Sequence, residues 1–225
     1  MTPAPLEPHA LYIWNRSTAV SDGDLDMAVA AIQIQVTEHL YPHWQADADL
    51  VVLPKDQSPP PLAWVITLAD LCPEPGDLGY HEDDSLPSGI VGVKTCQQDG
   101  VSWSSCLSHE VLELVVDPYA VTCMAVGANA LMLEISDAVE GKPYKVNGVE
   151  VENFVLPDWY RRESLGPWDY CGVLTGPLQL AHGGYLSSAP LGAWGQTNGE
   201  HVRACKARPR HESRRARRMR MGMAK

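Results

Sequence analysis

SHEVLELVVDP, residues 108–118, predicts a helix that carries three acid–base side chains on one side. His109 and Glu113 are four residues apart, so a helix places them on the same face, one turn from each other. Glu110 follows His109 and can reach the same space. The Asp-Pro pair at 117–118 ends the helix, because proline disfavours a helical conformation in the residue before it. A histidine and two carboxylates spaced in this way form a candidate site for a divalent metal ion.

Upstream of this helix, short apolar runs alternate with turn-forming residues. A helix is expected over 25–39, where apolar residues recur at intervals of three or four, and it is expected to end before Tyr41–Trp44. The runs at 49–54 and 63–68 are nearly all apolar, which is typical of strands covered on both faces. The full set of expected strands is 11–14, 49–54, 63–68 and 89–94, with a further short run at 78–81.

This order of elements predicts an α+β fold, in which a mixed, twisted sheet packs against the helix at 102–116. Downstream, a second helix is expected over 131–138, and Asn147-Gly148 predicts a hairpin turn. The remainder is rich in Gly and aromatic residues and predicts a loop-rich lobe. One domain is therefore expected over residues 1–200, with halves at 10–118 and 119–200, followed by a disordered basic tail at 201–225.

A catalytic metal ion needs three protein ligands and one position left for water. His109 offers a nitrogen and Glu113 an oxygen on the same helical face, and Glu110 is the natural base for the bound water. The third ligand has to come from outside this helix.

The motif resembles the H-E-x-x-H helix of zincin metallopeptidases, with Glu113 where the second histidine of that motif stands. The segment LEISD, residues 133–137, is similar to the segment of thermolysin-type zincins that supplies a glutamate as third ligand and an aspartate as support, although the spacing here is three residues rather than four. The resemblance implies Glu134 as the third ligand and Asp137 as the residue that hydrogen-bonds to His109 and orients it toward the metal. It also implies a zincin-like fold, a peptide or protein substrate, and an edge strand that aligns the substrate above the site.

The chain also resembles a group of bacterial and phage-associated proteins of uncharacterised activity. That likeness rests on the Ser-His-Glu-x-x-Glu-x-x-x-Asp-Pro helix, the Glu-x-x-Asp segment and the Gly-Gly-Tyr at 183–185. It implies that the glutamate at position 113 is a feature of the group.

Two carboxylates and one histidine make a harder ligand set than two histidines and one glutamate. Zinc is the metal that the resemblance implies, and Mn²⁺, Ca²⁺ or iron fit the harder donors. Asp117 lies on the same face as His109 and is either a further ligand or, at the helix end, a capping residue. The alternative interpretation is that His109, Glu110 and Glu113 are polar residues on an exposed helix face.

Three residues outside the helix are weaker candidates. Tyr185 can polarise an oxyanion, although a packed tyrosine is the simpler interpretation. His182 precedes the Gly-Gly-Tyr and can face the site, and His81 lies where it can approach the cleft.

Charge is distributed unevenly along the chain. Residues 1–200 contain seven Lys/Arg and 27 Asp/Glu, a net charge of −20, whereas residues 201–225 contain ten Lys/Arg and one acid, a net charge of +9. The basic run at 203–220 can bind a polyanion, the acidic body of the chain or a neighbouring subunit. Residues 1–8 do not look like a signal peptide, and no long apolar run is present, so a cytoplasmic protein with free cysteines and no membrane contact is expected.

Two functions follow from the sequence. The first is a metal-dependent hydrolase, a zinc peptidase with Glu110 as general base. The alternative is a non-enzymatic structural or assembly protein on a degenerate zincin fold, a virion component if the gene belongs to a phage, which docks through its basic tail.

Overall fold

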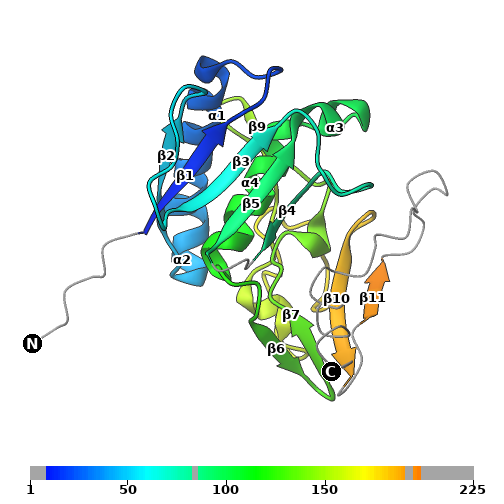
Figure 1. The fold of residues 1–225 in the computed structure, drawn as a ribbon. Coiled ribbons are helices and arrows are strands. Elements are labelled where there is room, and N and C mark those ends of the chain that lie inside the picture. The colour runs from blue at the N-terminus through cyan, green and yellow to red at the C-terminus, as the bar shows by residue number, and fades with distance from the viewer. Residues whose placement is uncertain (1–8, 83–85, 191–194, 199–225) are drawn as a thin grey trace, which may run out of the picture.

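The computed structural model describes residues 9–82, 86–190 and 195–198 (Figure 1). Its helices are α1 (Asp22–Ile34), the π-helical segment η1 (Gln35–Leu40), α2 (Tyr41–Trp44), α3 (Val93–Gln98), α4 (Trp103–Val116) and the 3₁₀ turns η2 (Asp137–Val139) and η3 (Pro157–Tyr160). Its strands are β1 (His9–Asn15), β2 (Ala48–Leu53), β3 (Trp64–Ala69), β4 (Gly79–Glu82), β5 (Ser88–Gly92), β6 (Cys123–Val126), β7 (Asn129–Met132), β8 (Tyr144–Val146), β9 (Val149–Val151), β10 (Tyr185–Pro190) and β11 (Gly195–Asn198).

The main sheet has five strands in the order β2-β1-β3-β5-β4. The first four strands of that order pair in parallel, and β4 is antiparallel to β5 at the end of the sheet. The expected α+β class and the mixed sheet are therefore confirmed. The strand β4 passes close to α4 (Figure 1), which brings residues 79–82 to this helix.

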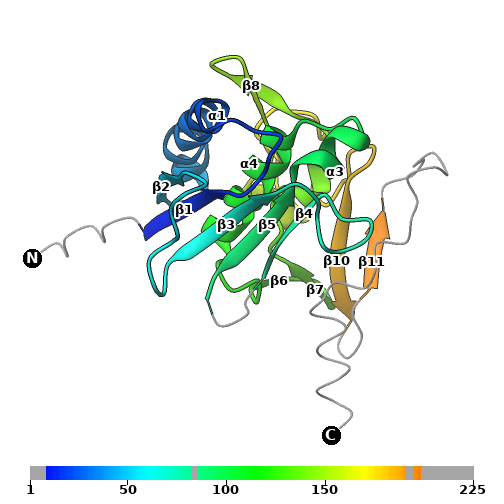
Figure 2. The same ribbon diagram turned by 45° about the horizontal axis from the view of Figure 1, so that its top comes forward.

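One face of this sheet is buried more deeply than the other. In β1, Leu11 and Ile13 are buried, while Tyr12 and Trp14 between them are only partly buried. Strand β3 alternates in the same way. Helices α1 and α4 lie on the same face of the sheet (Figure 2). The apolar runs expected to be strands are strands, and their second face, which carries aromatic and β-branched side chains, is only partly buried.

The long N-terminal helix runs further than expected. Ser21 caps its start by accepting a hydrogen bond from the amide of Asp24, and the chain stays helical to Trp44. Pro42 does not stop it, because the turn before it widens to a π-helix in which the amide of Tyr41 bonds to the carbonyl of Val36. The helix thus ends at Trp44 rather than at His39, so the expected boundary is wrong.

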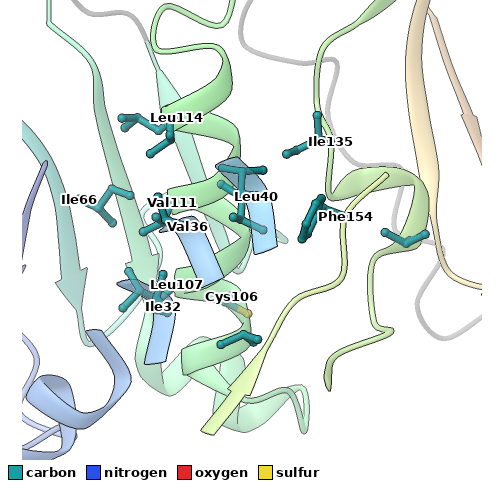
Figure 3. Packing of buried hydrophobic residues seen from close by; sticks show 14 of the residues in the cluster. Ile32, Val36, Leu40, Ile66, Cys106, Leu107, Val111, Leu114, Ile135 and Phe154 are labelled. Atoms are coloured by element: carbon teal, nitrogen blue, oxygen red, sulfur yellow. The ribbon is translucent and has the colours of Figure 1, made fainter. Parts of the chain in front are cut away.

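Helix α4 occupies the centre of the molecule. All its residues from Ser104 to Val115 are buried. Figure 3 shows α4 between Ile66 of the main sheet on one side and Ile135 and Phe154 of the C-terminal half on the other. Residues of both halves therefore surround it, and a polar side chain on α4 has almost no solvent to face.

The C-terminal half contains a four-stranded sheet in the order β11-β10-β7-β6 and the separate hairpin β8–β9. The hairpin is confirmed, with Asn147 and Gly148 both at positive φ (49° and 85°), as a type I′ turn requires. The expected helix at 131–138 is wrong. That segment is the end of β7, then an irregular stretch, then the 3₁₀ turn η2, because β7 pairs on both sides with β6 and β10.

Three expectations concern other parts of the chain. The basic tail at 201–225 lies outside the described residues. Within the described ranges, no helix combines the length and the apolar character needed to cross a bilayer. Cys96, Cys106 and Cys171 are free thiols.

Candidate metal centre

Three side chains of α4 are buried despite being polar. His109 is 8%, Glu110 6% and Glu113 3% exposed, so the interpretation of these residues as an exposed helix face is wrong. Helical spacing places the His109 and Glu113 side chains together, with His109 Nε2 lying 3.3 Å from Glu113 Oε1. Buried ionisable groups are costly without partners, so their surroundings decide what they do.

Residues 133–139 fold back onto α4, which places Glu134 and Asp137 beside His109 and Glu113. The amide of Ser136 donates a hydrogen bond of 3.1 Å to Glu113 Oε1. Asp137 Oδ1 lies 3.2 Å from His109 Nε2, the same nitrogen that faces Glu113. His109, Glu113 and Asp137 therefore form a set in which one donor atom from each lies within 4.8 Å of the other two.

Glu134 and Asp137 differ in their positions from what the resemblance implies. Asp137 faces the Nε2 of His109 directly, as part of a candidate ligand set, and Glu134 belongs to no set of donor atoms found among the described residues. Glu134 lies beside this set, however. Burial raises the pKa of Glu134, and the neighbouring charges of Asp137 and Glu113 raise it further.

His81 joins the cluster from β4. Its side chain is 5% exposed, and its Nδ1 lies 3.5 Å from Glu110 Oε2 and 3.6 Å from Glu113 Oε2. His81, Glu110 and Glu113 form a second set of donor atoms within 4.8 Å of one another. No role for His81 was predicted from the sequence, because its approach to α4 depends on the antiparallel pairing of β4 with β5. The one sequence feature that pointed to a place for His81 near the site was its position in a short extended run before α4.

The carboxylates around His81 and His109 favour the protonated form of both imidazoles. Burial opposes protonation of His81, but the Glu110 carboxylate, and then Glu113, outweigh it and raise its pKa to about 9. Burial likewise opposes protonation of His109, and Glu113 and Asp137 more than compensate, so its pKa is also raised. Burial and then Glu113 raise the pKa of Asp137 to about 6, although the nearby charge of His109 and a hydrogen bond from Tyr185 act in the opposite direction.

Two tyrosines line the same space. Tyr185, at the start of β10, hydrogen-bonds to Asp137. Gly184 permits this approach, because a Cβ at that position would lie 2.2 Å from the carbonyl oxygen of Ala138. Tyr160 was not foreseen from the sequence. Its hydroxyl is buried with no hydrogen-bond partner, and burial, followed by the charge of Glu113, raises its pKa.

Asp117 and His182 stand apart from the cluster. The Asp117 carboxylate accepts hydrogen bonds from the amide of Thr122 at 2.7 Å and from its hydroxyl at 2.9 Å, which fixes the turn after α4. Of the two roles that the sequence left open for Asp117, the structure supports the capping and turn role. His182 is exposed.

The donor set fits a divalent cation. Oxygens of Asp137 and Glu134 and the Nε2 of His81 are buried without hydrogen-bond partners. Asp137 Oδ1 lies 3.2 Å from His109 Nε2 but does not have the geometry of a hydrogen bond with it. The two atoms point into the same space, and neither satisfies the hydrogen-bonding capacity of the other. Carboxylate oxygens with one or two imidazole nitrogens suit Mn²⁺ or Zn²⁺.

No family model, curated protein or solved structure matches this chain. Function therefore has to be inferred from the side chains that meet on α4.

Proposed function

We propose that the chain is a metal-dependent hydrolase of zincin type that cleaves peptide bonds. The observation that carries this proposal is the convergence of His109, Glu113 and Asp137 at a buried point beside Glu110. The order of strands, with an antiparallel end strand next to the metal-site helix, agrees with the resemblance seen in the motif.

The ligands in this proposal are His109, Glu113 and one or both acids of the 134–137 segment. Asp137 has the shorter approach to His109, and Glu134 lies next to it. With at least two carboxylates for each imidazole, the site favours Mn²⁺ or another hard divalent ion alongside Zn²⁺, and Ca²⁺ is the third candidate.

A bound cation in such a site lowers the pKa of its water and polarises the scissile carbonyl. Glu110 accepts the proton of the attacking water, because its carboxylate is the one on α4 that His109 does not contact. Tyr185 is the first candidate donor of a hydrogen bond to the developing oxyanion, in exchange for the hydrogen bond that its hydroxyl makes to Asp137. Tyr160 is the second candidate donor, since its hydroxyl is not engaged otherwise.

The substrate would lie along β4. This strand ends the main sheet, and a Cβ at Gly79 would lie 3.0 Å from Glu110 Oε1, so the strand backbone passes close to the proposed base. A peptide that adds to the sheet beside its end strand is held by backbone hydrogen bonds, so its binding depends little on its amino-acid sequence.

The test combines metal content with peptide cleavage. Protein purified without chelator is expected to contain at least one equivalent of metal by mass spectrometry and to cleave an unstructured protein substrate. Glu110→Gln should abolish cleavage while the ion held by His109, Glu113 and Asp137 remains. Glu163→Gln, the same change at an exposed residue, should leave both unchanged. Metal well below one equivalent together with no cleavage would overturn the proposal.

One observation favours the non-enzymatic alternative. His81 between Glu110 and Glu113 can partly neutralise the buried acids as an imidazolium, without a cation. A protein of this kind would be an assembly component that docks through its tail. It would be purified free of metal, and deletion of residues 203–225 would remove partner binding.

A further inference from the structure

Glu113 is the one residue shared by two sets of donor atoms. Its Oε1 faces His109 Nε2 at 3.3 Å, in the set completed by Asp137. Its Oε2 faces His81 Nδ1 at 3.6 Å, in the set completed by Glu110. The two oxygens of one carboxylate therefore point to two different histidines, from α4 and from β4.

The second set, His81, Glu110 and Glu113, resembles the ligand set of a metal ion. The side chain of His81 is 95% buried, being 5% exposed, and its Nε2 has no hydrogen-bond partner. Its Nδ1 stands 3.5 Å from Glu110 Oε2, which is at the outer limit of a hydrogen bond. A buried imidazole with such long contacts to two carboxylates leaves room for an ion between them.

The charge of the whole cluster points to more than one cation. Glu110, Glu113, Glu134 and Asp137 carry four formal negative charges when ionised, within a region that is almost wholly buried. One divalent cation at His109 leaves an excess of two negative charges, or of one when His81 is protonated, whereas two divalent cations neutralise the set with both imidazoles neutral. Buried charge without compensation is strongly unfavourable, so the balanced state is preferred.

We propose that Glu113 bridges two divalent cations, one held by His109, Glu113 and Asp137 and the other by His81, Glu110 and Glu113. This inference rests on the proposed metal-dependent function and extends it to a two-metal site for hard ions of the Mn²⁺ type. Carboxylate-bridged ions of this kind lie about 3.5–4 Å apart and hold both sides of a displaced group. Glu110 would hold the second ion through Oε2, and its Oε1, on the side of Gly79, remains to accept the proton of the water.

The test is the number and coupling of bound Mn²⁺ ions. Chelator-treated protein titrated with Mn²⁺ is expected to bind two ions per chain, and its electron paramagnetic resonance spectrum should show exchange coupling in place of isolated six-line signals. His81→Gln should reduce the stoichiometry to one uncoupled ion. The matched control, His182→Gln, changes an exposed histidine and should retain both ions.

Each alternative outcome has a definite meaning. One ion per chain, unaffected by His81→Gln, overturns the two-metal inference and leaves the proposed function standing. No ion overturns both. Two ions without coupling place the second ion away from Glu113 and also overturn the inference. Circular dichroism of His81→Gln confirms that the variant is folded, and the stoichiometry of the unchanged protein decides the inference without any variant.

Discussion

The amide of Ser136 donates a hydrogen bond to Oε1 of Glu113, and this contact joins two segments 23 residues apart at the centre of the site. It fixes the Glu113 carboxylate from the side of the C-terminal half, while α4 positions it from the other. The same contact brings Asp137 to His109. Formation of the candidate metal centre therefore depends on the packing of both halves of the chain.

Glu113 is expected to be essential for metal binding. Glu113→Gln keeps the size of the side chain and removes the charge that both histidines face, so Mn²⁺ affinity should fall by at least about 100-fold, since loss of a residue that merely supports a ligand already costs about 10–100-fold. Competition with a metal-binding dye measures the affinity. Glu163→Gln is the control, and an unchanged affinity in Glu113→Gln would remove Glu113 from the site.

Gly184 is expected to be required for the position of Tyr185. In Gly184→Ala the new Cβ would meet the backbone oxygen of Ala138 at 2.2 Å, so one of the two segments has to move, at about 1–3 kcal/mol of stability. Urea denaturation gives this loss. Gly176→Ala is the matched control, because nothing lies within 4 Å of a Cβ there. Equal stability of the two variants would contradict the close packing of β10 on η2.

Phe154 is expected to carry a large part of the packing between α4 and the C-terminal half. It is completely buried on the side of α4 opposite the main sheet (Figure 3). Phe154→Ala should cost about 3–5 kcal/mol of unfolding free energy and weaken metal binding as well, because residues 133–139 pack in the same layer. Leu165→Ala, at a residue that is 95% exposed, should cost almost nothing. A small effect of Phe154→Ala would mean that the two halves are held together elsewhere.

The chelated protein is expected to lose stability as pH rises. The pKa of His81 is raised to about 9 from its ordinary 6.5, so its favourable contribution is complete below pH 6.5 and disappears as pH rises through 9. The pKa of Asp137 is raised to about 6, and its contribution likewise declines as pH rises through that value.

Thermal unfolding in chelator, compared between the unchanged protein and His81→Gln, isolates the contribution of His81. Between pH 6.5 and 9 the midpoint of His81→Gln should fall less steeply. Parallel curves would show that His81 carries no charge between Glu110 and Glu113.

Local patterns in the sequence predicted the elements that depend on local structure. The spacing of His109 and Glu113 predicted α4, and Asn147-Gly148 predicted the hairpin, because both signals act over a few residues. The segment at 131–138 was misassigned because a short apolar run does not distinguish a helix from a buried strand, and its distant partner β10 decided the outcome.

The residues of the candidate site likewise divide into those that local sequence patterns predicted and those that they did not. His109, Glu110 and Glu113 come from one helix and were predictable, and Asp137 was singled out with its neighbour Glu134. His81 and Tyr160 could not be assigned, since nothing near them in the sequence says that β4 and η3 end beside α4. Side chains that reach a site through tertiary contacts alone have no periodic signal.

The most direct measurement is a crystal structure of the protein saturated with Mn²⁺, with anomalous diffraction data that locate the ions. One anomalous peak is expected among His109, Glu113 and Asp137, and a second among His81, Glu110 and Glu113. The absence of any peak within ligand distance of Glu113 would contradict it.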